Sequence, residues 1–90
     1  MDSTLRREPV KLHIIVYVDD DEAYIGMDVF STFEAALKQF DARYAETLEE
    51  HDGDPDWFTI YERDPANHNL RFVDQDFYEV FYRTEILQEA

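Results

Sequence analysis

A single long stretch of helical periodicity, residues 30–50, constrains the fold of this chain more than any other feature. Its apolar side chains recur every three or four residues, which places them on one face of an α-helix. They are Phe33, Ala36, Leu37, Phe40, Tyr44 and Leu48. Ser31 is a good N-cap, and Glu34 follows it at capping-box spacing. Gly53 and Pro55 end the pattern, so we predict one helix of about 30 Å, long enough to cross a small domain.

Four segments rich in β-branched and aromatic residues flank this helix and predict strands. Residues 10–18 and 24–29 precede the helix, and residues 57–63 and 70–73 follow it. The short acidic turn at residues 19–22 makes an antiparallel hairpin the simplest pairing of the first two strands. The first strand is apolar on both faces at its centre, which indicates an interior position in the sheet.

Local sequence details add three expectations for the strands. Gly26 marks a bulge or a point of close packing in the second strand. Strict alternation in the third strand would place Phe58 and Ile60 on one face, and Trp57 and Tyr61 on the other.

The C-terminal segment, residues 77–87, is compatible with a strand or a helix. Its Phe, Tyr, Val and Thr residues favour a strand. Asp76 and Glu79 have the spacing of a helix cap, and apolar residues also recur at helical spacing. We expect a strand. The order β-β-α-β-β plus this C-terminal strand or helix predicts an α+β fold: a two-layer, mostly antiparallel sheet with one long helix packed on one face.

The domain organisation follows from composition. Residues 1–9 are polar and end at Pro9, which predicts a flexible N-terminal arm, and residues 10–90 form a single acidic α+β domain. Cysteine is absent from the chain, which excludes disulfides and thiolate chemistry. No apolar run approaches the roughly 20 residues that cross a bilayer, and no secretory signal is evident. We therefore expect a cytoplasmic protein, located in the host cytoplasm if it is viral.

Charge is the most unusual property of the chain. It has 22 acidic residues against 8 basic ones, for a net charge of −14. Thirteen of the acids, and only Lys38 and Arg43 of the bases, lie within residues 19–56. Such self-repulsion destabilises a compact state, so it calls for an explanation such as a basic partner, solubility or salt adaptation. Direct binding to nucleic acid or to an anionic membrane is disfavoured, because both need clustered Lys and Arg.

Motifs for catalysis, metals and cofactors are missing. The three histidines do not have metal-ligand spacing. A calcium loop counted from Asp52 would place Trp57 and Arg63 where glycine and a bidentate glutamate are needed. The two serines, Ser3 and Ser31, are not in a nucleophile motif, and two glycines are too few for a phosphate loop. We expect no enzyme activity, no metal and no cofactor.

The acidic residues themselves are the best functional candidates. Gathered on one side of the fold, they would resemble the phosphate rows of a duplex and attract a protein with a basic groove. The sequence predicts a non-enzymatic DNA mimic that occupies this groove in a nucleic-acid-binding protein, in the manner of phage-encoded anti-restriction or anti-CRISPR inhibitors. The predicted partner-binding residues are Asp19, Asp20, Asp21, Glu22, Glu46, Glu49, Glu50, Asp52, Asp54 and Asp56.

Other interpretations stay open at this level. The acidity is also compatible with a soluble domain adapted to high salt, or with a regulatory, antitoxin-like interaction module. If the chain does bind a protein, exposed aromatics such as Tyr24, Tyr78 or Tyr82 could serve as anchors. The chain could be a monomer or a homodimer formed through an uncovered sheet edge.

Overall fold

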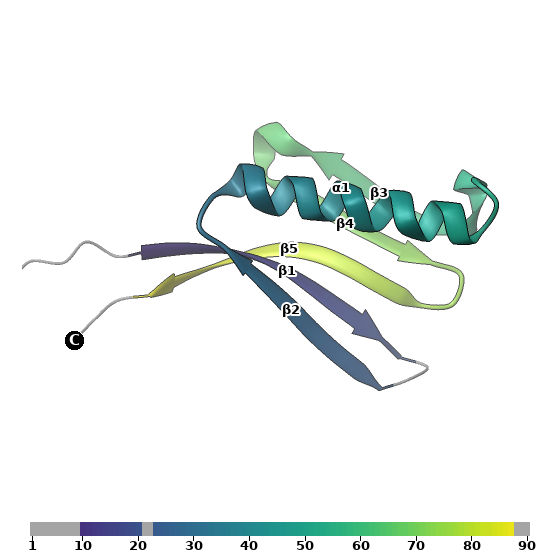
Figure 1. Cartoon of the computed structure of the whole chain (residues 1–90), viewed down its shortest axis with the longest axis horizontal. Coiled ribbons are helices and arrows are strands. Elements are labelled where there is room, and N and C mark those ends of the chain that lie inside the picture. Colours follow the sequence, from purple (N-terminus) through teal and green to yellow (C-terminus); the bar gives the residue numbers. More distant parts are fainter. Residues whose placement is uncertain (1–9, 21–22, 88–90) are drawn as a thin grey trace, which may run out of the picture.

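The computed structural model describes residues 10–20 and 23–87, which form a five-stranded sheet and one long helix (Figure 1). The strands are β1 (Val10–Asp19), β2 (Tyr24–Phe30), β3 (Phe58–Asp64), β4 (Asn69–Asp74) and β5 (Tyr78–Leu87). The helix is α1 (Phe33–Glu50), and two short 3₁₀ turns are η2 (Pro55–Trp57) and η3 (Pro65–Asn67). The predicted α+β fold, with a helix packed on one face of an antiparallel sheet, is confirmed. The predicted arm, residues 1–9, lies outside the described residues.

The strands have the spatial order β2-β1-β5-β4-β3, and every neighbouring pair is antiparallel. β1 therefore has the interior position that its apolar centre predicts. The C-terminal segment is a strand, as expected, and pairs with β1 over its full length, from Val10 opposite Leu87 to Asp19 opposite Tyr78. Because β5 is paired with β1 on one side and with β4 on the other, the helical alternative is removed.

The helix begins three residues later than the sequence predicts. Ser31 is not the N-cap. Thr32 has that role, with an extended backbone and a hydroxyl that accepts a hydrogen bond from the Ala35 amide at 3.2 Å. Phe30 is the last residue of β2, where it pairs with His13 of β1. The chain before Thr32 is thus held in strand pairing and cannot join the helix. With Thr32 as the N-cap, Glu34 is one position too early for a capping box.

The third strand also differs from its predicted pattern. Trp57 belongs to η2, and a break in the β3–β4 register between Phe58 and Ile60 interrupts the alternation. As a result Phe58 and Tyr61 both pack on Tyr44 of the helix, with ring centroids 4.7 Å and 4.4 Å from the Tyr44 ring. The irregularity lets two aromatic rings of one edge strand contact the same helical residue.

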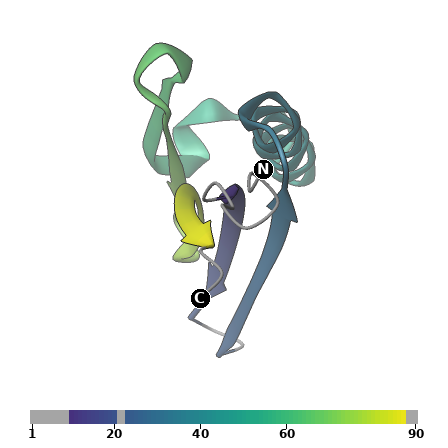
Figure 2. The same cartoon turned by 90° about the vertical axis from the view of Figure 1, so that its left-hand side faces the viewer.

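The hydrophobic core lies between α1 and the sheet face that it covers, as Figure 2 shows from one end. Phe40 and Phe72 are fully buried, with ring centroids 5.5 Å apart. The helical stripe is close to the predicted one, except that Thr47 is buried in the last turns while Leu48 is only half-buried. The remaining buried members of the core are Ile15, Tyr17, Phe33, Ala36, Leu70 and Val80.

Gly26 is a point of close packing rather than a bulge. The β1–β2 register runs without a break past Gly26, which lies opposite Tyr17. The ring of Tyr24 lies over Gly26, so that a Cβ there would be 2.4 Å from the Tyr24 hydroxyl oxygen. A larger residue at position 26 would therefore displace the Tyr24 ring. Within the part of the chain that the structure describes, no helix is long and apolar enough to cross a membrane.

Truncating the central core ring should be costly. We expect Phe40→Ala to lower the free energy of unfolding by about 3–5 kcal/mol, because Phe40 is fully buried and a cavity would remain. Ile86→Ala is the control, since Ile86 is 57% exposed. Urea unfolding followed by circular dichroism gives both values. Equal losses in the two variants would contradict this assignment of the core.

Acidification should weaken the fold at His13. This side chain is only 8% exposed and its Nδ1 lies 2.6 Å from the Tyr82 hydroxyl. Burial chiefly, with the charges of Lys11 and His68, lowers the pKa of His13 below its ordinary value, and Glu34 opposes the shift. The folded state therefore disfavours the protonated form, so the stability contributed by neutral His13 is present above about pH 6.5 and is lost as pH falls toward the folded-state pKa.

This pH effect can be isolated by comparing the wild type with His13→Gln. The wild type should lose more unfolding free energy than the variant as the pH falls below about 6.5. Carboxylates titrate in both proteins, so their contribution cancels in the difference. Parallel pH curves for the two proteins would show that His13 is not responsible.

Candidate functional site

Three of the connections between elements lie together at one end of the molecule. The elements alternate in direction along the chain, so the β1–β2, α1–β3 and β4–β5 connections share the end at the right of Figure 1. The β2–α1 and β3–β4 connections lie at the other end. Ser31, Thr32 and residues 65–68 form those two connections and include no acidic residue.

The shared end holds most of the negative charge among residues 10–20 and 23–87. Ten carboxylates lie on these three connections, on the last residues of β1 and β4 and on the last turns of α1, and Arg43 is the one Lys or Arg residue with them. We call this set the acidic end. Its carboxylates belong to Asp19, Asp20, Glu46, Glu49, Glu50, Asp52, Asp54, Asp56, Asp74 and Asp76. The rest of the described chain has seven acidic and five basic residues, so the excess charge is local.

The structure thus places eight of the ten predicted binding residues at one end. Asp19, Glu46 and Glu50 line a common pocket. Glu49 is exposed on the last turn of α1, and Asp20, Asp52, Asp54 and Asp56 are exposed on the connections. The other two, Asp21 and Glu22, lie outside the described residues.

The binding residues predicted from the sequence do not include Asp74 and Asp76. Asp74 ends β4 and Asp76 lies on the β4–β5 connection, and both line the same pocket as Asp19, Glu46 and Glu50. If the predicted elements alternate in direction along the chain, this connection lies beside the end of the helix. The order of the elements therefore indicates that Asp74 and Asp76 belong to the site.

The end of the helix is built to project its acids. The Gly53 amide donates to the Leu48 carbonyl at 2.8 Å and the Asp52 amide to the Glu49 carbonyl at 3.2 Å, the two bonds of a Schellman ending. Asp52 and Gly53 have positive φ angles of 59° and 73°, which turn the chain sharply. The Asp54 carboxylate then accepts from the Asp56 amide at 2.9 Å and begins η2. The negative charges of this segment therefore stand on a defined turn.

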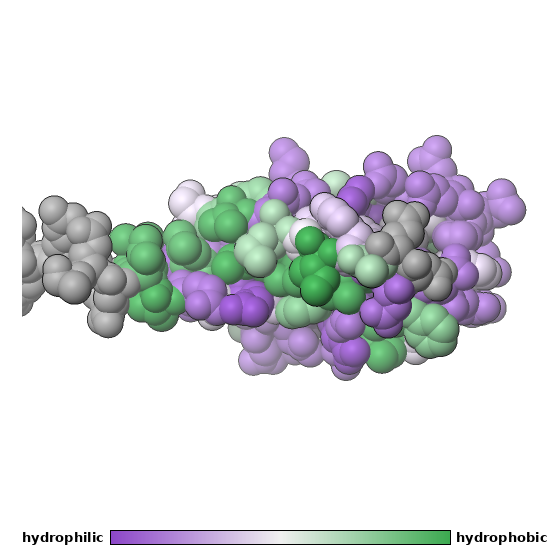
Figure 3. Space-filling model, turned by 90° about the horizontal axis from the view of Figure 1, so that it is seen from below, coloured by the Kyte–Doolittle hydropathy of each residue, from purple (hydrophilic) through white to green (hydrophobic). Residues whose placement is uncertain are grey.

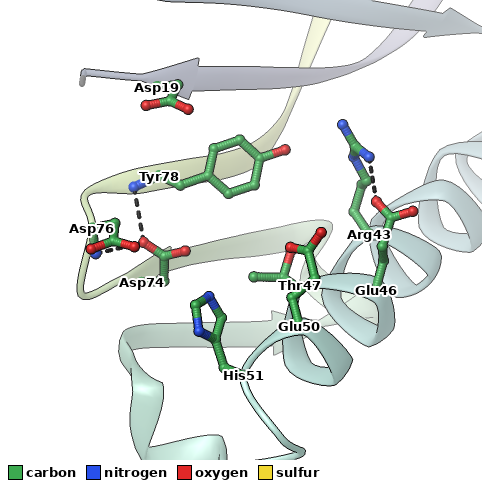
Figure 4. Close-up of a pocket in the computed structure, with 9 residues that line it drawn as sticks. All are labelled: Asp19, Arg43, Glu46, Thr47, Glu50, His51, Asp74, Asp76 and Tyr78. Atoms are coloured by element: carbon green, nitrogen blue, oxygen red, sulfur yellow. Dashed lines mark hydrogen bonds and ion pairs between the residues drawn. The ribbon is translucent and has the colours of Figure 1, made fainter. Parts of the chain in front are cut away.

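The pocket between the helix end and the strands has a volume of about 460 Å³ (Figure 4). Its wall is strongly polar and comes from α1 and the residue after it, from the end of β1, and from the end of β4, the β4–β5 connection and the start of β5. Five carboxylates face one guanidinium and one imidazole across it. The lining residues are Asp19, Arg43, Glu46, Thr47, Glu50, His51, Asp74, Asp76 and Tyr78.

Asp74 holds the β4–β5 connection in shape. It is 3% exposed, and its Oδ1 accepts hydrogen bonds from the Asp76 amide at 2.8 Å and the Tyr78 amide at 3.1 Å. These bonds, drawn in Figure 4, support a turn in which Phe77 has a positive φ angle of 64°. A buried carboxylate that accepts two amides is a strong structural element.

Arg43 is held at the edge of the pocket by several groups. Its Nη1 lies 2.6 Å from a Glu46 carboxylate oxygen, and its guanidinium is 4.9 Å from the centre of the Tyr17 ring. Burial raises the pKa of Tyr78, and the nearby Arg43 opposes that shift. Burial, followed by the hydrogen bond to Asp28, raises the pKa of Tyr17 to about 12. Both phenols are therefore neutral near pH 7, and Arg43 compensates only part of the local negative charge.

The proposed aromatic anchors are mostly not exposed. Tyr78 and Tyr82 are half-buried and pack against the core, so the expectation that they stand free on the surface is wrong. Their alternation on β5 turns them toward the helix. Tyr24 is 56% exposed on β2, near the acidic end. Trp57, which is stacked on His51 with ring centroids 4.0 Å apart, is a half-buried aromatic that the sequence did not single out for this site.

The arrangement suits electrostatic binding of cations. Among residues 10–20 and 23–87, no group of three His, Asp or Glu side chains is placed to hold a metal ion. What the pocket offers is carboxylate oxygen, the acceptor that guanidinium and ammonium groups prefer. Comparison of the chain with protein-family models, with curated proteins and with solved structures finds no match.

The role of Asp74 can be tested by two substitutions. Asp74→Ala should lower the free energy of unfolding by about 1–3 kcal/mol, because two amides lose their buried acceptor. Asp74→Asn keeps an acceptor oxygen and should lose clearly less. Thermal unfolding monitored by calorimetry would distinguish them. If both variants are as stable as the wild type, the turn does not depend on this carboxylate.

Proposed function

We propose that this protein is a non-enzymatic acidic binding protein that occupies the basic nucleic-acid-binding groove of a partner protein. The observation that best supports the proposal is the concentration of ten carboxylates, with a single arginine, at one end of the fold. A partner of this kind presents Lys and Arg side chains spaced for phosphates, and the acidic end offers anions in their place.

Local concentration favours binding over general hydration as the reason for the acidity. A chain that is acidic only to stay hydrated has no need to gather ten carboxylates at one end, when Glu34 and Asp64 are the acids that adjoin the two connections at the other. Outside the acidic end, moreover, three of the seven carboxylates form ion pairs: Asp41 with Arg63, Glu79 with Arg71, and Glu85 with Arg83. The unbalanced charge thus coincides with one surface.

The pocket supplies a specific element within this surface. Its carboxylates come from three segments, and its volume of about 460 Å³ can admit a basic side chain from a partner. An arginine entering there would meet the carboxylates of Asp19, Glu50 and Asp76 in a partly enclosed setting. Such a contact would supply the anchor that diffuse charge attraction lacks.

The proposal predicts salt-dependent capture that nucleic acid can reverse. The immobilised protein should retain nucleic-acid-binding proteins from a cell lysate at low salt, and either added duplex DNA or rising salt should release them. For a captured protein, Glu49→Gln with Glu50→Gln should weaken the affinity by about tenfold, at roughly 0.5–1 kcal/mol per exposed charge. Binding isotherms over a range of salt give this change.

The matched control removes the same number of charges elsewhere. Glu34→Gln with Glu62→Gln changes two exposed glutamates outside the acidic end and should leave the affinity nearly unchanged. Equal weakening in the two double variants would show that only net charge matters. Retention of proteins that duplex DNA does not displace would rule out the mimicry.

A further inference from the structure

The sheet face opposite the helix is apolar over β1 and β2, and no helix or strand among residues 10–20 and 23–87 covers it. Alternation along the strands turns Ile14, Val16 and Val18 of β1 away from the core, beside Val29, Met27 and Ile25 of β2. Figure 3 views this side of the molecule and shows apolar residues along its middle. Ile25, Met27 and Val29 are 70%, 56% and 53% exposed, so β2 contributes most of the open apolar surface.

Among the charged residues on this face, those nearest its apolar part are paired, whereas Glu62 and Asp64 lie on the edge strand β3. Phe81 extends the apolar surface onto β5, next to Val16. The neighbouring charges form Arg71–Glu79 and Arg83–Glu85 ion pairs. The unbalanced carboxylates lie at the acidic end, which is the strongly hydrophilic right-hand end of Figure 3. The apolar parts of two such faces, on β1 and β2, can therefore meet without bringing the acidic ends into opposition, although each chain has a net charge of −14.

The residues outside the described part of the chain contain few apolar side chains that could pack on this face. Residues 1–9, 21–22 and 88–90 include only three apolar side chains besides Pro9, those of Met1, Leu5 and Ala90. The face itself is large enough for an interface. Five strands about 4.8 Å apart and up to ten residues long span roughly 700 Å², close to the 800 Å² or so that each partner buries in a standard complex.

We propose that two copies of this chain pack face to face through the uncovered sheet, burying Ile25, Met27 and Val29 of each. Isologous packing of two sheets at the usual 10 Å spacing gives a closed dimer. Repulsion between the acidic ends favours the arrangement with the two-fold axis across the strands, which places those ends at opposite extremes of the dimer. The dimer then presents two separate acidic ends.

Sedimentation equilibrium at moderate salt tests this interface. The wild type should approach twice the 10.8 kDa of one chain as its concentration rises. Ile25→Glu, at a residue already 70% exposed, should weaken dimerisation by at least about tenfold, because it places charge in an apolar contact. Ile86→Glu is the control: Ile86 is 57% exposed but points to the helix side of β5, next to Lys11.

Several results would overturn the proposal. One is a wild type that remains a monomer at every concentration. Another is an equal effect of Ile25→Glu and Ile86→Glu on dimerisation. A dimer joined through the β2 edge would slow amide exchange at the β2 amides that do not bond to β1, whereas face packing leaves them exchanging. Spin labels at Glu49→Cys should lie farther apart than the length of a ten-residue strand, about 33 Å. Capture by the acidic end does not depend on this dimer, so the two proposals can fail separately.

Discussion

The alternating direction of the six elements is the constraint on which the rest of this structure depends. Each element, helix included, reverses the one before it, and α1 returns the chain across the sheet from one edge strand, β2, to the other, β3. Every second connection therefore falls at the same end. The packing of Phe33, Ala36 and Phe40 on the sheet enforces this path, because only the long helix can bury that stripe while it crosses. The position of the acidic residues at one end therefore follows from the way the core packs.

Much of the fold could be predicted from local patterns. The helical stripe, the hairpin and the C-terminal strand are each encoded within one segment. The N-cap could not be placed, because Ser31 and Thr32 are equally good caps and the choice depends on Phe30 pairing with His13, far away in sequence. The irregularity after Phe58 likewise depends on Tyr44, which receives two rings of β3.

The candidate site was predictable in its residues and not in its shape. Acid-rich stretches at residues 19–22 and 46–56 are evident in the sequence, and the element order brings Asp74 and Asp76 to them. The pocket, by contrast, depends on the rotation of α1, which buries Thr47 in its last turns. The fold also separates two surfaces, with unbalanced charge at one end and apolar side chains of β1 and β2 on the sheet face opposite the helix. This separation allows one small domain to have two different contacts.

The stability of the protein as a function of KCl concentration tests the central claim, that the carboxylates form one closely spaced group. Repulsion within such a group is screened once the Debye length falls from about 30 Å at 0.01 M to about 8 Å at 0.15 M. The free energy of unfolding should rise over this range and then level off. A flat response below about 0.15 M, followed by a steep gain in molar KCl, would contradict the account and indicate adaptation to high salt.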